Sequence, residues 1–182
     1  SGLVDDLFAL SRLQSGSWTP TFDDVLVADV VSDTLASCEA SAAERGVVLD
    51  GEADGPLPVR ADEREVQRAV ANIVVNAIRH TPPGGQVQVR AAALAGAVHV
   101  SVTDGCGGIP AEDLPHVFDV AWRGSAARTP GDDVGAGLGL AIVAAVAAAH
   151  GGEVEVANVT GGCRFVLVLP AHPSPRPLVD AG

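Results

Sequence analysis

The chain has 182 residues, of which 47% are hydrophobic and 19% charged, which is enough for one globular domain with a hydrophobic core. It contains no apolar run of about eighteen residues, so we expect no membrane-spanning helix. Its 11 basic and 23 acidic residues give a formal net charge of -12, which excludes a general affinity for nucleic acid.

The first residues have the spacing of an amphipathic helix. Leu3, Leu7, Leu10 and Leu13 recur at three- and four-residue intervals, and the pattern stops near Gly16. Because the pattern is already under way at residue 1, we expect residues 1–16 to be the end of a longer helix. A separate N-terminal helix that packs on its own domain is the alternative. No charged-then-apolar leader opens the chain, so we expect no secretion signal.

Residues 17–170 alternate between strand and helix patterns. We expect a short strand at 18–22, a helix from about 25 to 45, short strands at 47–49 and 59–61, and a helix from Asp62 to near Thr81. Strands at 86–94 and 98–103 follow, joined as a hairpin at Ala95-Gly96. Residues 118–135 have no regular hydrophobic spacing and predict a long mobile loop. A helix from Gly137 to about His150 and strands at 153–157 and 164–169 are expected after it. The proline-rich residues 171–182 predict a disordered tail.

The mixed order of these elements predicts an α+β sandwich, with one sheet and its helices on one face. Three cysteines, Cys38, Cys106 and Cys163, are odd in number and far apart in the sequence. This argues against a disulfide framework or a zinc cluster, and it fits a reducing cytoplasm.

Asn72 and Asn76 lie one turn apart on the helix that begins at Asp62, and Arg79 and His80 follow at its end. Two interpretations are open. A buried asparagine is most often simply hydrogen-bonded within the core, and this is the commoner case. Alternatively, an amide oxygen can serve Mg²⁺ while the guanidinium and imidazole meet phosphate oxygens.

Two glycine-rich segments follow. Asp104 stands directly after an apolar strand and before three glycines, so its carboxylate could accept from an exocyclic amine while a planar ring approaches the backbone. The segment could equally be a turn. Residues 135–140 form a second glycine-rich turn that runs into a helix and presents free amides to anions. Its glycine spacing differs from that of the dinucleotide-binding fingerprint.

Four segments in this order resemble the N, G1, F and G2 boxes of sensor histidine kinases: the Asn72–Asn76 pair, Asp104 with its glycines, residues 118–123 and residues 135–139. These kinases belong to the same ATPase superfamily as gyrase, Hsp90 and MutL. The resemblance covers about residues 3–170 and extends to details at 70–82, 138–143, 150–152 and 165–170. It implies the two-layer α/β sandwich of the Bergerat (GHKL) ATPase fold, with a mixed, mostly antiparallel sheet and a mobile ATP lid. Residues 1–16 would be the remnant of the dimerisation and phosphotransfer helix, and residues 17–170 the ATP-binding catalytic domain.

The resemblance also implies a role for each motif residue. Asn76 would be the magnesium ligand, with Asn72 supporting the phosphate side. Asp104 would accept the adenine amine and so select ATP over GTP. The implied nucleotide-binding residues are Asn76, Arg79, His80, Asp104, Gly108, Ile109, Arg123, Gly135, Gly137, Leu138, Gly139 and Cys163. Arg123 would reach the terminal phosphate from the lid, and it joins Asn72 and Asn76 as the implied catalytic residues.

Three positions depart from the family pattern. Cys106 replaces a glycine, which would be strained if that position needs positive φ, unless a shifted turn at Gly107 relieves it. Cys163 replaces a threonine, which would lower adenine affinity or change its hydration. Ala121 replaces a phenylalanine and leaves the lid a smaller anchor. Cys106 and Cys163 could lie close together, so that their oxidation blocks adenine; two small buried thiols are the favoured alternative.

None of the five histidines is followed by an acidic residue, so we expect the phosphoacceptor histidine to lie outside this chain. The resemblance implies an ATP- and Mg²⁺-dependent histidine kinase domain that cannot phosphorylate itself. It would serve a dimerisation domain that is absent here, for relay to a response regulator.

The full-length protein is expected to be a membrane-anchored homodimer with this domain in the cytoplasm, and the fragment a monomer or weak dimer that binds no nucleic acid. A clamp-type ATPase and a degenerate nucleotide-dependent interaction module are the alternatives.

Overall fold

The computed structural model describes residues 11, 20–122 and 137–172. Its principal feature is a five-stranded sheet in the order β2-β4-β5-β7-β6, beside a small two-stranded sheet of β1 and β3. The strands are β1 (Asp23–Leu26), β2 (Val48–Ala53), β3 (Pro58–Ala61), β4 (Gln86–Leu94), β5 (Ala97–Thr103), β6 (Glu153–Val159) and β7 (Gly162–Pro170). The helices are α2 (Val27–Glu44), α3 (Glu63–His80), the 3-10 turn η1 (Leu114–His116) and α4 (Gly139–Ala149).

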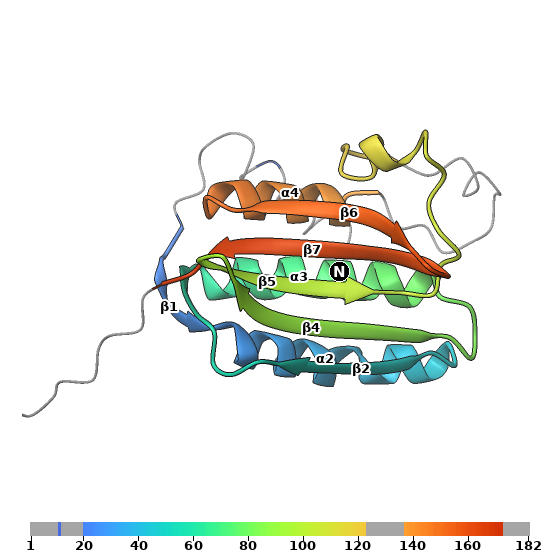
Figure 1. Cartoon of the computed structure of the whole chain (residues 1–182), viewed down its shortest axis with the longest axis horizontal. Helices are drawn as coiled ribbons and strands as arrows, with labels where there is room; N and C mark the ends of the chain where they lie inside the picture. Colours follow the sequence, from blue (N-terminus) through green and yellow to red (C-terminus); the bar gives the residue numbers. More distant parts are fainter. Residues whose placement is uncertain (1–10, 12–19, 123–136, 173–182) are drawn as a thin grey trace, which may run out of the picture.

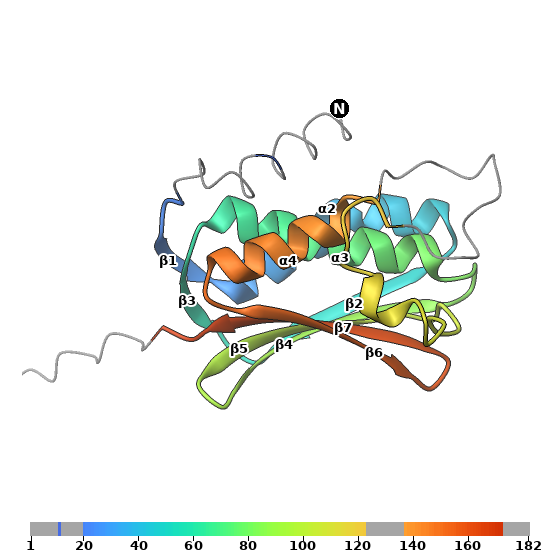
Figure 2. The same cartoon turned by 90° about the horizontal axis from the view of Figure 1, so that it is seen from above.

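The large sheet is mixed and mostly antiparallel. Only β2 and β4 pair in parallel, while β4–β5, β5–β7 and β6–β7 are antiparallel. Figure 2 shows α2, α3 and α4 together on one face of the sheet, and Figure 1 shows the same two layers with the sheet in front of the helices. The predicted α+β sandwich with helices on one face is therefore confirmed.

The core fills the space between these two layers. The alternate residues of β5 that face the helices, Val98, Val100 and Val102, are almost completely buried. α3 lies centrally and contacts both α2 and α4, and its Ile73 and Val74 have no exposed surface. Burial of such side chains at the helix–sheet boundary stabilises the fold by about 1.5–3 kcal/mol each.

The α3 helix begins and ends where the sequence predicts. Asp62 is its N-cap and accepts a hydrogen bond from the Glu65 amide at 3.4 Å, and Glu63 and Glu65 add negative charge to the first turn. Thr81 is the C-cap, directly before Pro82. These local signals fix the ends of the helix that carries Asn72 and Asn76.

The predicted boundaries need correction in several places. The first strand is at Asp23–Leu26 and pairs with β3, whereas residues 20–22 are not in a strand and 18–19 lie outside the described residues. The sequence pattern predicts no element at Leu114–His116, where the structure has the 3-10 turn η1. The disordered tail was expected from Ala171, but Ala171 pairs with Val59 and the His172 amide donates to the Pro58 carbonyl.

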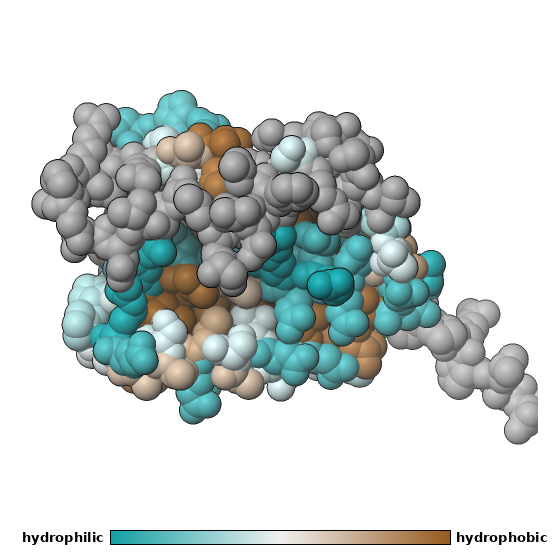
Figure 3. All heavy atoms as spheres, turned by 180° about the vertical axis from the view of Figure 1, so that it is seen from behind, coloured by the Kyte–Doolittle hydropathy of each residue, from teal (hydrophilic) through white to brown (hydrophobic). Residues whose placement is uncertain are grey.

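Some large apolar side chains remain exposed, among them Val75 on α3, which exposes 44% of its surface. Figure 3, turned to the helix side, shows separate apolar areas bordered by hydrophilic residues. Among the described helices, none has the length and apolarity needed to cross a membrane.

Candidate functional site

Asp104 is a buried carboxylate at the end of β5, and it exposes only 5% of its surface. Its Oδ1 accepts hydrogen bonds from the amides of Cys106 at 3.0 Å and Cys163 at 3.2 Å. The Cys163 thiol also donates to Oδ1 and Oδ2, at 3.2 and 3.4 Å. These contacts fix the orientation of the carboxylate, so that it can act as a preformed acceptor for a ligand.

The backbone places Cys163 opposite Asp104. β5 and β7 pair with Thr103 opposite Arg164, and the Asp104 amide continues the ladder by donating to the Cys163 carbonyl at 3.0 Å. A Cβ at Gly162 would collide with the Asp104 carbonyl oxygen, so this position requires glycine. Cys163 thus donates to Asp104 from the start of β7.

Thr81 joins the end of α3 to the Asp104 loop. Its buried hydroxyl donates to the Ala77 carbonyl at 2.8 Å and accepts from the Gly105 amide at 3.3 Å. Sequence reasoning did not single out Thr81 as a site residue. The signal available was a hydroxyl at the helix end, directly before two prolines.

The backbone turn after Asp104 places its positive φ angles on glycines. Gly107 and Gly108 have φ values of 81° and 105°, whereas the described non-glycine residues with positive φ are Leu57, Ala95 and Ala121. Cys106 therefore carries none of the backbone strain considered for it. Its thiol instead accepts from the Gly108 amide at 3.3 Å.

Asn158 on β6 clamps the far end of this loop. Its Oδ1 accepts from the Ile109 amide and its Nδ2 donates to the Ile109 carbonyl, both at 2.8 Å. Gly108 lies against the same side chain, with its ideal Cβ position 3.5 Å from Oδ1. Asn158 was missed in the sequence, because its role depends on the β6–β7 hairpin reaching the loop.

Near the middle of α3, Asn72 meets the start of α4. Its Nδ2 donates to the Gly139 carbonyl at 3.2 Å. The N-cap of α4, Leu138, makes no side-chain capping bond. The first amides of a helix have no intrahelical acceptor, so this end is a suitable anion-binding position.

Gly137 is packed tightly beneath the same segment. A Cβ on Gly137 would lie 2.6 Å from the Trp122 carbonyl oxygen, and its carbonyl accepts from the Ala121 amide at 3.1 Å. Phe118 packs edge-on against Phe165, with ring centroids 6.2 Å apart. Residues 121 and 122 therefore contact Gly137, on the two sides of residues 123–136. Of the predicted lid at residues 118–135, residues 123–135, including Arg123 and Gly135, lie outside the described residues.

Asn76 lies on α3 between the two contact points, Asn72 and Thr81. It is half-buried, one turn after Asn72 and one turn before His80. Arg79 and His80 are exposed at the helix end. Residues 72 and 81 are separated by about 13 Å along the axis, at 1.5 Å per residue.

The electrostatics link His80 to the Asp104 end. Desolvation lowers the pKa of His80 below its ordinary value, and the positive charge of Arg79 lowers it further. Asp104 acts in the opposite direction and raises it, with a smaller effect than that of Arg79. His80 is therefore mainly a neutral imidazole at pH 7.

Cys106 and Cys163 are brought together, as hypothesised. Their sulfurs and an Asp104 carboxylate oxygen all lie within 4.8 Å of one another, and both thiols are free. Burial raises the pKa of each thiol, more strongly for Cys163. Both are therefore protonated at neutral pH, which agrees with the favoured interpretation of two small thiols.

The described residues suit Mg²⁺ only in a limited way. Mg²⁺ prefers oxygen ligands and usually keeps water and substrate phosphates in its shell. Asn76 offers one amide oxygen, while the cluster of metal-ligand types in the described chain contains two sulfurs. A magnesium ion at Asn76 would thus need phosphate oxygens as further ligands, which fits an ion that arrives with a nucleotide.

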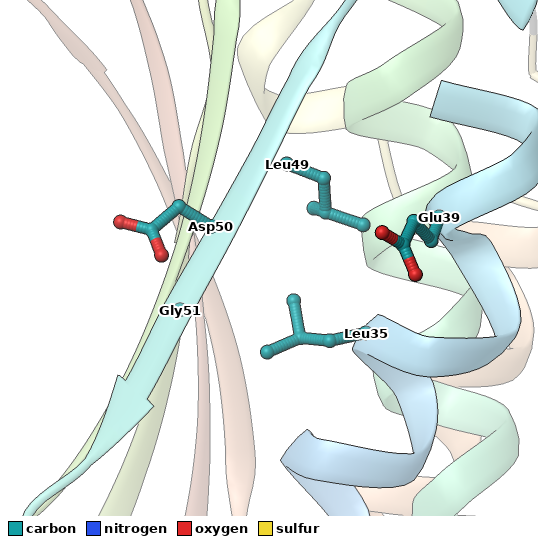
Figure 4. Close-up of a pocket in the computed structure, with 5 residues that line it drawn as sticks. All are labelled: Leu35, Glu39, Leu49, Asp50 and Gly51. Carbon is teal, nitrogen blue, oxygen red and sulfur yellow. The ribbon is translucent and has the colours of Figure 1, made fainter. Parts of the chain in front are cut away.

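A shallow hollow lies elsewhere, between α2 and β2. It is lined by Leu35, Glu39, Leu49, Asp50 and Gly51, which Figure 4 shows on facing parts of the helix and the strand. The leucines point into the gap between the two elements, and Asp50 points away from it. None of these residues belongs to the predicted site.

Comparison with known proteins agrees with this arrangement. Residues 61–173 match the family described as histidine kinase-, DNA gyrase B- and HSP90-like ATPases. The sensor-like histidine kinase SenX3 of Mycobacterium tuberculosis is 36% identical over 181 residues, covering 96% of this chain and 44% of the relative. AfsQ2 of Streptomyces coelicolor, a signal transduction histidine-protein kinase, is 37% identical, covering 99% of this chain and 32% of the relative. The chain therefore spans less than half of each relative.

A solved structure of full-length ShkA in complex with AMPPNP superposes with a TM-score of 0.83. It is 28% identical, and the match covers 97% of this chain and 36% of ShkA. Fold, motif order and sequence similarity agree with one another. The chain therefore belongs to the histidine kinase-, DNA gyrase B- and HSP90-like ATPase family, as a catalytic domain of the sensor histidine kinase type.

Proposed function

We propose that this chain binds ATP with Mg²⁺ and donates the γ-phosphoryl group to a histidine outside the chain. That histidine would belong to the dimerisation domain of the same kinase, and an aspartate of a response regulator would receive the phosphoryl group next. The observation that carries the proposal is a pair of contacts that α3 makes with the two glycine-rich segments. Thr81 ties the C-terminal end of α3 to Gly105, next to Asp104, and Asn72 ties its middle to the start of α4.

The Asp104 end suits adenine. A carboxylate that is fixed by two amides can accept from the exocyclic amine of adenine, whereas the carbonyl of guanine in that position would repel it. Gly108 has no side chain to obstruct a planar ring, and Ile109 is half-buried beside it. Selection of ATP over GTP follows from this acceptor.

The Asn72 end suits phosphate. The first amides of α4, at Leu138 and Gly139, can donate to phosphate oxygens, and the helix dipole favours their negative charge. Arg79 and His80 would add donors from the end of α3. Asn76 would hold Mg²⁺ through its amide oxygen, and the ion would neutralise charge on the phosphates.

Phosphoryl transfer of this kind needs positioning and charge neutralisation more than covalent chemistry by the protein. Asn72 would position the start of α4 through its bond to the Gly139 carbonyl. Arg123 and Gly135 in the predicted lid, with the amide of Gly137 directly after it, would complete the phosphate side.

The histidines support an acceptor outside the chain. His150 is buried and its two ring nitrogens contact the Val146 carbonyl and the Asp62 amide, so its ring has a structural role. His116 lies in η1 and pairs with Asp119 at 2.8 Å. We propose a full-length homodimer, anchored in the membrane, with this domain in the cytoplasm and residues 1–16 continuing the dimerisation helix. The fragment itself would be a monomer or weak dimer.

The test is a nucleotide titration with and without Mg²⁺, followed by incubation with γ-labelled ATP. We expect ATP to bind more tightly with Mg²⁺ and better than GTP, and we expect no label on the chain alone. Label should appear on an added dimerisation domain that carries the acceptor histidine. Binding without any transfer would favour the degenerate interaction module, and label on this chain alone would contradict the proposal.

A further inference from the structure

Asp104, Cys106 and Cys163 form a compact cluster of metal-ligand atoms, of which the proposed adenine recognition uses only the Asp104 carboxylate to contact the base. One ligand atom from each lies within 4.8 Å of the other two. Asp104 and Cys163 are buried, and Cys106 is partly exposed. The cluster therefore combines two sulfurs and an oxygen at the edge of the domain, with one ligand accessible from solvent.

The Cys163 sulfur and the Asp104 carboxylate have the separation of two ligands in a tetrahedral zinc site. Zn–S bonds of about 2.3 Å and a Zn–O bond of about 2.0 Å place the sulfur and oxygen about 3.5 Å apart, and two sulfurs about 3.8 Å apart. The Cys163 sulfur already lies 3.2 and 3.4 Å from the two Asp104 oxygens. The Cys106 sulfur lies within 4.8 Å of the Cys163 sulfur and an Asp104 oxygen.

Neighbouring backbone groups support the same atoms. The Gly108 amide donates to the Cys106 sulfur at 3.3 Å, and the amides of Cys106 and Cys163 donate to Asp104. Hydrogen bonds of this kind orient metal ligands and stabilise their negative charge. Gly107 gives the Cys106 segment freedom to adjust.

We propose that Asp104, Cys106 and Cys163 bind a thiophilic divalent ion such as Zn²⁺, and that this ion and adenine exclude one another at Asp104. On binding, each thiol releases its proton to solvent and the sulfur bonds to the ion, which leaves a fourth position for water. Mg²⁺ would not compete, because it prefers oxygen ligands. The mutual exclusion rests on the proposed role of Asp104 in binding ATP, whereas the ion site itself does not.

Cys38, the third cysteine, provides a control for the proposed ion site. Cys38 is buried on α2, remote from this cluster in the sequence and fold, and belongs to no group of three metal-ligand residues among the described residues. Cys38→Ser is therefore the matched control for loss of one thiol. Cys163→Thr and Cys106→Ser remove the two sulfurs while keeping a small polar side chain.

The first measurement uses Cd²⁺ alone on the reduced, metal-free chain and follows the ultraviolet absorption of cadmium–thiolate bonds. We expect one Cd²⁺ per chain with two thiolates. Cys106→Ser and Cys163→Thr should weaken binding at least about tenfold, and Cys38→Ser should leave it unchanged. Circular dichroism confirms that each variant folds. Equal Cd²⁺ affinity in Cys163→Thr and the wild type, or loss of the absorption in Cys38→Ser, would overturn the site.

The second measurement titrates a fluorescent ATP analogue with and without one equivalent of Zn²⁺, using Cys163→Thr as the control for chelation of Zn²⁺ by the nucleotide. Zn²⁺ should weaken binding at least about tenfold more in the wild type than in the variant. Equal weakening in both would overturn the exclusion. If neither protein binds nucleotide without Zn²⁺, the proposed function fails, and the cadmium absorption still decides the ion site.

Discussion

The hydroxyl of Thr81 should matter for nucleotide binding as well as for the fold, and Thr81→Val tests this. Valine has nearly the same shape but removes the acceptor of the Gly105 amide. An amide left without a partner costs about 1–3 kcal/mol, and the 3.3 Å length places this bond toward the lower end. The Ala77 carbonyl loses little, because the Thr81 amide still donates to it at 3.0 Å. We therefore expect a loss of about 1–2 kcal/mol in the free energy of unfolding.

Thr81→Ser is the matched control. It keeps both hydrogen bonds and removes one buried methyl group, which costs about 1 kcal/mol of unfolding free energy. Urea unfolding should thus show similar losses for the two variants. Nucleotide titration should separate them: about tenfold weaker ATP binding for Thr81→Val and little change for Thr81→Ser. If both variants bind ATP equally well, the bridge between α3 and the Asp104 loop does not position the site.

Three further predictions concern specificity, pH and the hairpin. Asp104→Asn keeps one acceptor oxygen for the two amides but presents a donor to the base. The ratio of ATP to GTP affinity should therefore fall by about tenfold or more in a competition titration, and an unchanged ratio would refute adenine recognition by Asp104. The pKa of His80 is lowered in the folded chain, so the unfolded chain takes up the proton first, and the free energy of unfolding should fall as the pH drops below the ordinary value of 6.5. His80→Gln should reduce that pH dependence in urea unfolding curves, and identical pH profiles would contradict it. Ala95 has φ 52° in the hairpin turn before Gly96, so Ala95→Asn should raise the free energy of unfolding by about 0.5–1 kcal/mol, whereas a decrease would show that the turn does not carry this strain.

Local signals in the sequence predicted the elements that carry the site. α3 was placed by apolar periodicity together with the acidic first turn after Asp62, and the β4–β5 hairpin by Ala95-Gly96. The first strand was placed too early because its edges carry no turn or capping signal. Leu26, the N-cap of α2, makes no side-chain capping bond, so nothing in the sequence marks the change from β1 to α2.

The contacts between distant segments could not be predicted from local pattern. Asn158 reaches Ile109 only because the β6–β7 hairpin extends to the Asp104 loop. The spacing of the cysteines argued against a metal cluster, because that argument considers ligands close together in the sequence. The pairing of β5 with β7 instead brings Cys163 to Asp104, 59 residues away in the sequence.

The central claim is that Asn76 and Asp104 bind opposite ends of one nucleotide. The most direct test compares the affinities of Asn76→Ala and Asp104→Asn for adenosine, which lacks phosphate, and for ATP with Mg²⁺. Asn76→Ala should weaken binding of ATP with Mg²⁺ by about tenfold or more and leave adenosine binding unchanged, whereas Asp104→Asn should weaken both. If Asn76→Ala weakens adenosine binding as much as ATP binding, or Asp104→Asn affects neither ligand, the two residues do not serve the two ends of the same nucleotide.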